Sequence, residues 1–152
     1  AAGAWLVVPA VPAHADCQPH PPTSGATVTC ADTDSDGFRV TAPGFSDLVV
    51  GVLPGATISA AGNTPLSLRG NDHRLVNEGS IIAGLTAGGT PSSAVFVQLG
   101  SSFTLDNSGL NRAGEGATSF GGAALNLSSV NGASLRNDAT GVIEHQDGRP
   151  AR

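Results

Sequence analysis

Short stretches of alternating hydrophobic and polar residues follow one another through the second half of the chain. In Val95–Leu99 the alternation places Val95, Val97 and Leu99 on one face, as in a half-buried β-strand. Similar stretches occur at residues 66–68 and 125–127. Each is only about three to five residues long, which is too short to form a stable sheet alone. The pattern therefore predicts β-strands that depend on neighbouring strands.

These stretches belong to an internal repeat. Leu75, Leu105 and Leu135 are spaced by 30 residues, and each lies two positions before an asparagine. An apolar residue or pair follows each asparagine, so every unit is predicted to run strand, turn, strand, Asn-centred turn, strand and loop. Stacking the units would pair each strand with its equivalent and bury the inward leucines in one column. We therefore predict an all-β fold, a parallel β-helix or solenoid.

The repeated asparagines, Asn77, Asn107 and Asn137, allow two interpretations. One is a ladder of amides that contacts a ligand. The other is a structural turn ladder, in which each amide stacks on the amide of the next coil, because Asn tolerates left-handed turn conformations. We favour the structural interpretation, because Gly follows two residues later in two of the three units.

The first half of the chain has weaker strand signals. The candidates are residues 38–40, 48–52 and 56–58, separated by the turn signals Pro43-Gly44 and Pro54-Gly55. We expect them to form an irregular first coil, so that residues 38–152 are the β-helix. Residues 16–37 are expected to cap its open N-terminal end, where strand edges would otherwise be exposed. Residues 85–94 and 111–123 are expected to be loops.

Residues 1–15 have the character of a processing signal. They contain no Asp, Glu, Lys or Arg, and an apolar stretch is followed by prolines and by Ala13-His14-Ala15. Small residues at −3 and −1 fit a signal peptidase, so we expect cleavage after Ala15 and export of the protein. Since the chain has no Met, we expect it to be a fragment whose basic signal region lies upstream.

Cys17 and Cys30 are the only cysteines, and we expect them to form a disulfide. Paired cysteines are typical of exported chains, and the loop between them is rich in proline. A metal site or a redox pair is the alternative. It has little support, because there is no C-x-x-C motif and His20 is the only metal-binding side chain between them.

Composition and charge narrow the function classes. The net charge is −5, and all seven basic residues are arginines scattered among twelve acidic ones, so we expect no nucleic-acid partner. Helix-forming Lys, Glu and Met are rare or absent. The chain contains no run of about 18 apolar residues, so the sequence predicts no membrane-spanning helix.

Asp32, Asp34 and Asp36, followed by Gly37, match the first half of a calcium-binding loop. The twelfth position is Pro43, where such a loop needs a bidentate Glu. We therefore treat these residues as a weak calcium candidate and predict no metal and no cofactor. His20, His73 and His145 share no metal-binding spacing, and residues 144–147 are interpreted as a polar loop. No catalytic residue is assigned, because neither a nucleophile elbow nor a phosphate-binding loop occurs.

The chain resembles the N-terminal passenger region of bacterial autotransporters of the type V secretion system. The resemblance rests on the exported start, Cys17, Cys30, and the segments Asp34–Phe38, Pro54–Ile58, Leu75–Ile81 and Leu105–Gly109. It implies a right-handed β-helix at the cell surface. It also implies a partner, a C-terminal outer-membrane β-barrel translocator, which this chain lacks and before which it would be truncated.

We expect a non-enzymatic passenger segment, a structural or adhesive scaffold, exported through the periplasm to the cell surface, the outer membrane or the medium. Host or cell-surface glycans or proteins are the expected partners. One alternative is a fragment of a polysaccharide-active β-helix lyase or hydrolase, which needs paired carboxylates, for instance Asp106 and Asp138 with an Arg in one groove. Another is a haemagglutinin-like exoprotein of a two-partner secretion system.

Overall fold

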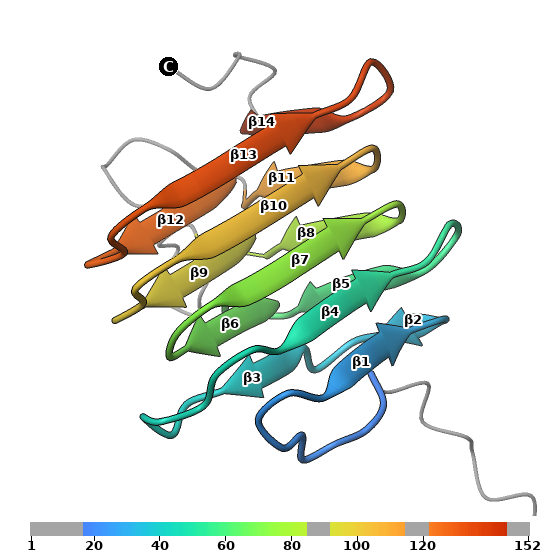
Figure 1. Ribbon diagram of the computed structural model, residues 1–152. Coiled ribbons are helices and arrows are strands. Elements are labelled where there is room, and N and C mark those ends of the chain that lie inside the picture. Colours follow the sequence, from blue (N-terminus) through green and yellow to red (C-terminus); the bar gives the residue numbers. More distant parts are fainter. Residues whose placement is uncertain (1–16, 85–91, 115–121, 146–152) are drawn as a thin grey trace, which may run out of the picture.

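In the computed structural model of the protein, short strands stack into three parallel sheets (Figure 1). The structure describes residues 17–84, 92–114 and 122–145. Each sheet receives one strand from every coil, so neighbouring strands are three apart in the chain order. The chain climbs from coil to coil in a right-handed sense. The predicted right-handed parallel β-helix is confirmed.

We name the sheets A, B and C and give their strands in spatial order. Sheet A consists of β1 (Thr27–Cys30), β4 (Val49–Val52), β7 (His73–Asn77), β10 (Phe103–Asn107) and β13 (Ala133–Asn137). Sheet B consists of β2 (Thr33–Asp34), β5 (Thr57–Ala60), β8 (Ser80–Ala83), β11 (Leu110–Ala113) and β14 (Val142–His145). Sheet C consists of β3 (Phe38–Val40), β6 (Leu66–Arg69), β9 (Val95–Gln98) and β12 (Leu125–Ser128).

The 30-residue repeat sets the strand register in sheet A. Leu75 pairs with Leu105, and Leu105 pairs with Leu135, so the three leucines lie above one another as predicted. In sheet B, Leu110 pairs with Ser80 on one side and with Val142 on the other. The last interval is two residues longer because the turn after Asn137 contains two more residues than the turn after Asn107.

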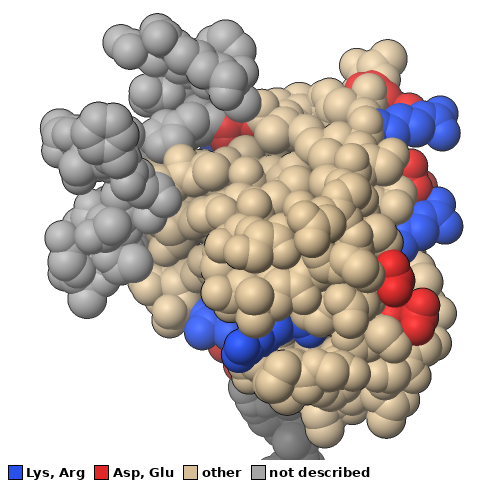
Figure 2. Space-filling view, turned by 60° about the vertical axis from the view of Figure 1, so that its left-hand side comes forward, with Lys and Arg blue, Asp and Glu red and all other residues tan. Residues whose placement is uncertain are grey.

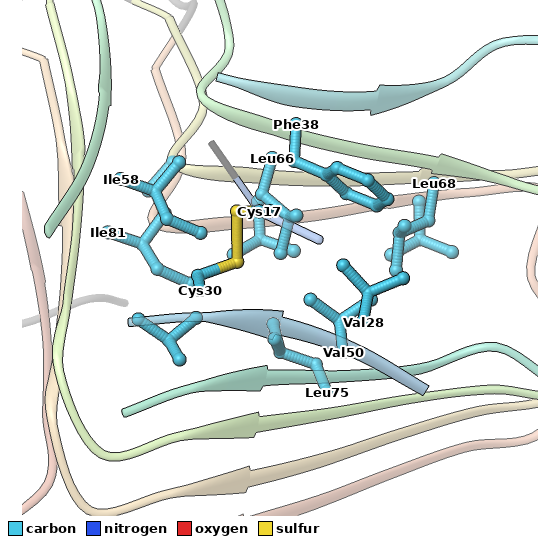
Figure 3. Packing of buried hydrophobic residues seen from close by; sticks show 14 of the residues in the cluster. Cys17, Val28, Cys30, Phe38, Val50, Ile58, Leu66, Leu68, Leu75 and Ile81 are labelled. Carbon is cyan, nitrogen blue, oxygen red and sulfur yellow. A yellow bond between two sulfur atoms is a disulfide. The ribbon is translucent and has the colours of Figure 1, made fainter. Parts of the chain in front are cut away.

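The core lies in the interior that the three sheets enclose. Buried and partly exposed residues alternate along most strands, as expected for strands with one face inward. Figure 3 shows side chains from all three walls converging: Val50 and Leu75 from sheet A, Ile58 from sheet B, and Phe38 and Leu66 from sheet C. Burial of such side chains contributes roughly 1.5–3 kcal/mol each.

The N-terminal end of the core is covered and cross-linked. Cys17 and Cys30 form a disulfide, and both are almost completely buried, which confirms the predicted clamp. Gln18 pairs antiparallel with Thr29, and the His20 ring packs edge-on against Phe38 with centroids 5.8 Å apart. Strands β1 and β2 lie within residues 16–37 and pair in parallel with β4 and β5. The first coil therefore begins inside the segment expected to be the cap.

Two expected loops contain strands. Strand β11 occupies the first part of residues 111–123, and β14 includes Glu144 and His145 of the expected polar loop. Both expectations were wrong at these positions, because the segments pair in register along sheet B. The signal segment 1–15, residues 85–91 and 115–121 of the expected loops, and Gln146 and Asp147 lie outside the described residues.

Candidate functional site

The outward side chains of sheet C form the most distinctive surface of the solenoid. We call this surface the sheet C face. The register aligns Arg39, Ser67, Phe96 and Asn126 in one column, and Arg69, Gln98 and Ser128 in the next. Neighbouring strands in a sheet lie about 4.8 Å apart, and alternate residues of one strand about 7 Å apart. The face is therefore a regular grid in which two arginines and a phenylalanine stand among short polar side chains.

Each arginine of the sheet C face is held against the coil by one backbone carbonyl. Arg39 donates from Nη2 to the Thr64 oxygen, and Arg69 donates from Nη1 to the Thr41 oxygen, both at 3.3 Å. Within the described structure neither guanidinium has a carboxylate within ion-pair distance. The Nε atom of each is shielded from solvent and has no hydrogen-bond acceptor among the described residues.

The arginines of the other sheets are paired with acidic residues. Arg74 and Asp106 form an ion pair of 2.7 Å across β7 and β10. Arg112 and Glu144 form one of 2.6 Å across β11 and β14. Figure 2 shows charged side chains as small, separate groups, with blue and red alternating near the right edge.

The two carboxylates considered for a carbohydrate-active site lie near each other on sheet A and its edge. Asp106 is in register with Arg136, which forms a 3.0 Å ion pair with Asp138. Each carboxylate thus has an arginine as its immediate partner.

The three residues of the calcium candidate are divided between the interior and the surface. Asp34 is buried, while Asp32 and Asp36 are exposed. The Asp34 carboxylate accepts backbone N–H groups from Gly37 at 2.7 Å, Asp36 at 3.2 Å and Cys17 at 3.4 Å. Burial raises the pKa of Asp34, and these N–H groups act in the opposite direction. The carboxylate thus fixes the turn before β3 and the start of the cap.

Within the described ranges, no three or more His, Cys, Asp or Glu side chains gather in a way that could hold a metal ion. Nor does any described residue belong to a helix with the length and apolarity needed to cross a membrane.

The repeated asparagines form a continuous amide stack at the turn between sheets A and B. Asn77 donates from Nδ2 to Asn107 Oδ1 at 2.9 Å, and Asn107 donates from Nδ2 to Asn137 Oδ1 at 2.7 Å. Asn111, which points inward from β11, donates to Asn107 Oδ1 at 2.9 Å. Asn77, Asn107 and Asn111 are almost fully buried, so these amides satisfy one another and the turn backbone within the coil.

The histidines of the described chain do not gather into a site. His73 is buried directly beneath Phe103, and the Leu48 N–H donates to its Nδ1 at 3.4 Å. Its Nε2 has no hydrogen-bond partner among the described residues. Burial lowers the pKa of His73, and the Arg69 backbone with the Asp47 and Asp72 carboxylates opposes this shift only in part.

Arg39, Arg69 and Phe96 belong to no motif that the sequence displays. Arg39 and Phe96 are 57 residues apart, and only the pairing of β3 with β6 and of β6 with β9 aligns them. The outward position of each residue between inward apolar neighbours was the one available signal. It becomes informative only when the register between coils is known.

No protein-family model, curated protein or solved structure matches this chain.

Proposed function

We propose that this chain is a non-enzymatic segment of an exported surface protein, a β-helical scaffold of the autotransporter-passenger kind that presents adhesive side chains. The observation that carries the proposal is the state of the acidic residues on the described strands. Asp106 and Glu144 are each paired with an arginine, and Asp34 is bound by backbone N–H groups. These carboxylates stabilise the coils, which leaves the flat outer faces for binding.

The outer faces suit weak contacts repeated many times. Strand register fixes the positions of outward side chains along each column, so the surface is ordered before any partner arrives. Preorganisation lowers the entropy lost on binding. Many copies at a cell surface would then convert modest single-site affinity into stable adhesion. The resemblance adds export, a position at the cell surface and an outer-membrane barrel in the full-length protein.

The test compares adhesion with turnover. The purified chain is attached to beads at high and low density, and retention on cultured cells and on immobilised glycans is measured. We expect retention to rise steeply with density, since avidity depends on simultaneous contacts. In parallel, acidic and neutral polysaccharides are incubated with the soluble chain and assayed for reducing ends and unsaturated products. Product formation, or the absence of retention at every density, contradicts the proposal.

Two variants serve as controls for the turnover assay. Asp106→Asn and Glu144→Gln remove the charges from sheets A and B that a carbohydrate-active enzyme could use. Both side chains are partly exposed, so the expected loss of stability is small, about 0–1 kcal/mol for each ion pair. Adhesion is expected to be unchanged in both. Turnover that disappears in either variant would identify a catalytic carboxylate instead.

A further inference from the structure

The sheet C face differs in charge from the rest of the described solenoid. Strands β3, β6, β9 and β12 contain Arg39 and Arg69 and no Asp or Glu. Sheets A and B, by contrast, hold the ion pairs of Arg74 and Arg112. In Figure 2 a group of blue atoms, with a little red at its lower edge, lies low on the molecule and away from the alternating groups at the right edge. On a chain with a net charge of −5, the sheet C face is locally cationic.

The two arginines are held in place but still have free donors. Each uses one terminal nitrogen on a backbone carbonyl, and each has a shielded Nε without an acceptor among the described residues. The second terminal nitrogen of each guanidinium has no hydrogen bond within the described structure, so it can donate to an anion that approaches from solvent. Arg39 is paired with Ser67, and Arg69 lies two residues along the same strand from Ser67. The Cα atoms of Arg39 and Arg69 are therefore roughly 8 Å apart. Because arginine side chains are long, both guanidinium groups can reach one acidic group, or two successive acidic groups, of the same ligand.

Phe96 adds an apolar surface beside the two charges. It points outward from β9, half-buried, with Ser67 on one side of its column and Asn126 on the other. Gln98 stands two residues further along the same strand, in register with Arg69. An outward aromatic ring, surrounded by hydroxyl and amide groups, can contact the apolar face of a ring while its neighbours hydrogen-bond the ring's polar edge.

We infer that the sheet C face is a binding site for an acidic oligosaccharide. Its carboxylate or sulfate groups bind Arg39 and Arg69, because guanidinium donors match planar and tetrahedral oxyanions. A neighbouring sugar ring packs on Phe96, and its hydroxyls bond to Ser67, Gln98 and Asn126. This inference names a ligand class for the proposed adhesive function and rests on that proposal. A nucleic acid fits less well, because its closely spaced phosphates need more basic residues than this face provides.

The test is a titration of the ¹⁵N-labelled chain followed by NMR. The probes are a polygalacturonate hexamer, a heparin-derived hexasaccharide and neutral maltohexaose. We expect amide shift changes centred on β3, β6 and β9 with at least one acidic probe and none with maltohexaose. The two acidic probes distinguish carboxylate from sulfate as the bound group. Absence of binding by both, or shift changes centred on sheets A or B, overturns the site.

Variants assign the binding to individual side chains. Arg39→Gln and Arg69→Gln are each expected to weaken binding of the acidic probe about tenfold, and Phe96→Leu about threefold. Arg136→Gln, on the exposed strand β13 of sheet A, removes the same charge and is expected to change binding less than twofold. Equal weakening by Arg39→Gln and Arg136→Gln would indicate non-specific charge attraction and overturn the site. Adhesion that persists in Arg39→Gln with Arg69→Gln would overturn this site while leaving the proposed scaffold function intact.

Discussion

At the scale of single residues, Asn107 connects more groups than any other described turn side chain. It accepts hydrogen bonds from Asn77 and Asn111, and it donates to Asn137 and to the Gly109 carbonyl. Because Asn77 and Asn111 are buried, water cannot replace Asn107 as their hydrogen-bond partner. A polar group left without a hydrogen-bond partner in the interior lowers the free energy of unfolding more than a hydrogen bond lost at the surface.

We therefore predict that Asn107→Leu lowers the free energy of unfolding by about 3 kcal/mol or more, because it leaves several buried amide groups unpaired. Asn137→Leu at the exposed end of the same stack is expected to lower it by about 1 kcal/mol. Urea denaturation followed by circular dichroism measures both. If Asn107→Leu retained full stability and lost only binding, the amide stack would be a ligand site and not a structural turn ladder.

His73 gives the protein a pH dependence with a definite sign. Its pKa in the folded protein lies below the ordinary value of 6.5, because burial disfavours the imidazolium form. The unfolded chain therefore binds more protons as the pH falls below about 6.5. The stabilisation from the neutral ring is complete above that pH and is lost as the pH falls towards the lowered pKa.

We predict that the free energy of unfolding decreases from pH 7.5 to pH 5, with a slope from His73 of at most about 1.4 kcal/mol per pH unit. His73→Phe, which places Phe beneath Phe103, should flatten this part of the profile. Asp34 contributes with the opposite sign: its raised pKa favours folding at low pH, and that contribution fades as the pH rises through it. A slope that is the same in wild-type and His73→Phe would contradict the assignment.

At the scale of strands, the same repeat position contributes differently to the free energy of unfolding in different coils. Leu105 is completely buried between Leu75 and Leu135, while Leu135 is 50% exposed. Removing a buried leucine side chain leaves a cavity whose cost adds to the lost transfer free energy. An exposed position leaves no cavity.

We predict that Leu105→Ala lowers the free energy of unfolding by about 3–5 kcal/mol, and that Leu135→Ala lowers it by less than about 1 kcal/mol. Both are measured in the same denaturation assay, and the m-value shows whether the two-state description holds for each variant. Similar losses for the two variants would mean that the end of the solenoid is covered in solution.

Most strands that sequence patterning predicted have apolar inward residues, such as Leu66, Val97 and Leu105. The strand after Asn107 was predicted from Leu110 alone. Strand β11 extends into the expected loop because its pattern is inverted: Asn111 points inward and hydrogen-bonds to Asn107, while Leu110 is only partly buried. Strand β2 was missed for a related reason, because Asp34 is its buried residue. Polar side chains that are satisfied inside the core carry no hydrophobic periodicity.

The sheet C face lay beyond sequence reasoning for a different reason. Arg39, Arg69 and Phe96 are outward residues of three different strands, β3, β6 and β9. Their proximity depends on the 28- or 29-residue offsets between β3, β6 and β9, whereas the repeat that the sequence displays is 30 residues long. Loop lengths set these offsets, and loop lengths leave no periodic signal.

At the scale of the whole molecule, the two described ends of the solenoid differ. At the N-terminal end Val28, Cys30 and Phe38 are almost fully buried under residues 17–26. At the other end Leu135 and Val142 are 50% and 41% exposed. Opening of a stacked array proceeds most readily from an end whose apolar side chains are poorly covered. The disulfide protects the opposite end, since it connects the cap to β1.

We predict that reducing the Cys17–Cys30 disulfide lowers the free energy of unfolding by about 3 kcal/mol, the value expected when a loop of this length is no longer closed in the unfolded chain. Hydrogen exchange measured by mass spectrometry should then show new opening in β1–β3, while exchange in β12–β14, already the fastest in the oxidised protein, stays the same. A Cys17→Ser, Cys30→Ser double variant should match the reduced protein and be unaffected by reductant. If reduction instead accelerated exchange evenly through β1–β14, the coils would unfold as one cooperative unit, and the cap would stabilise the whole solenoid rather than its first coil.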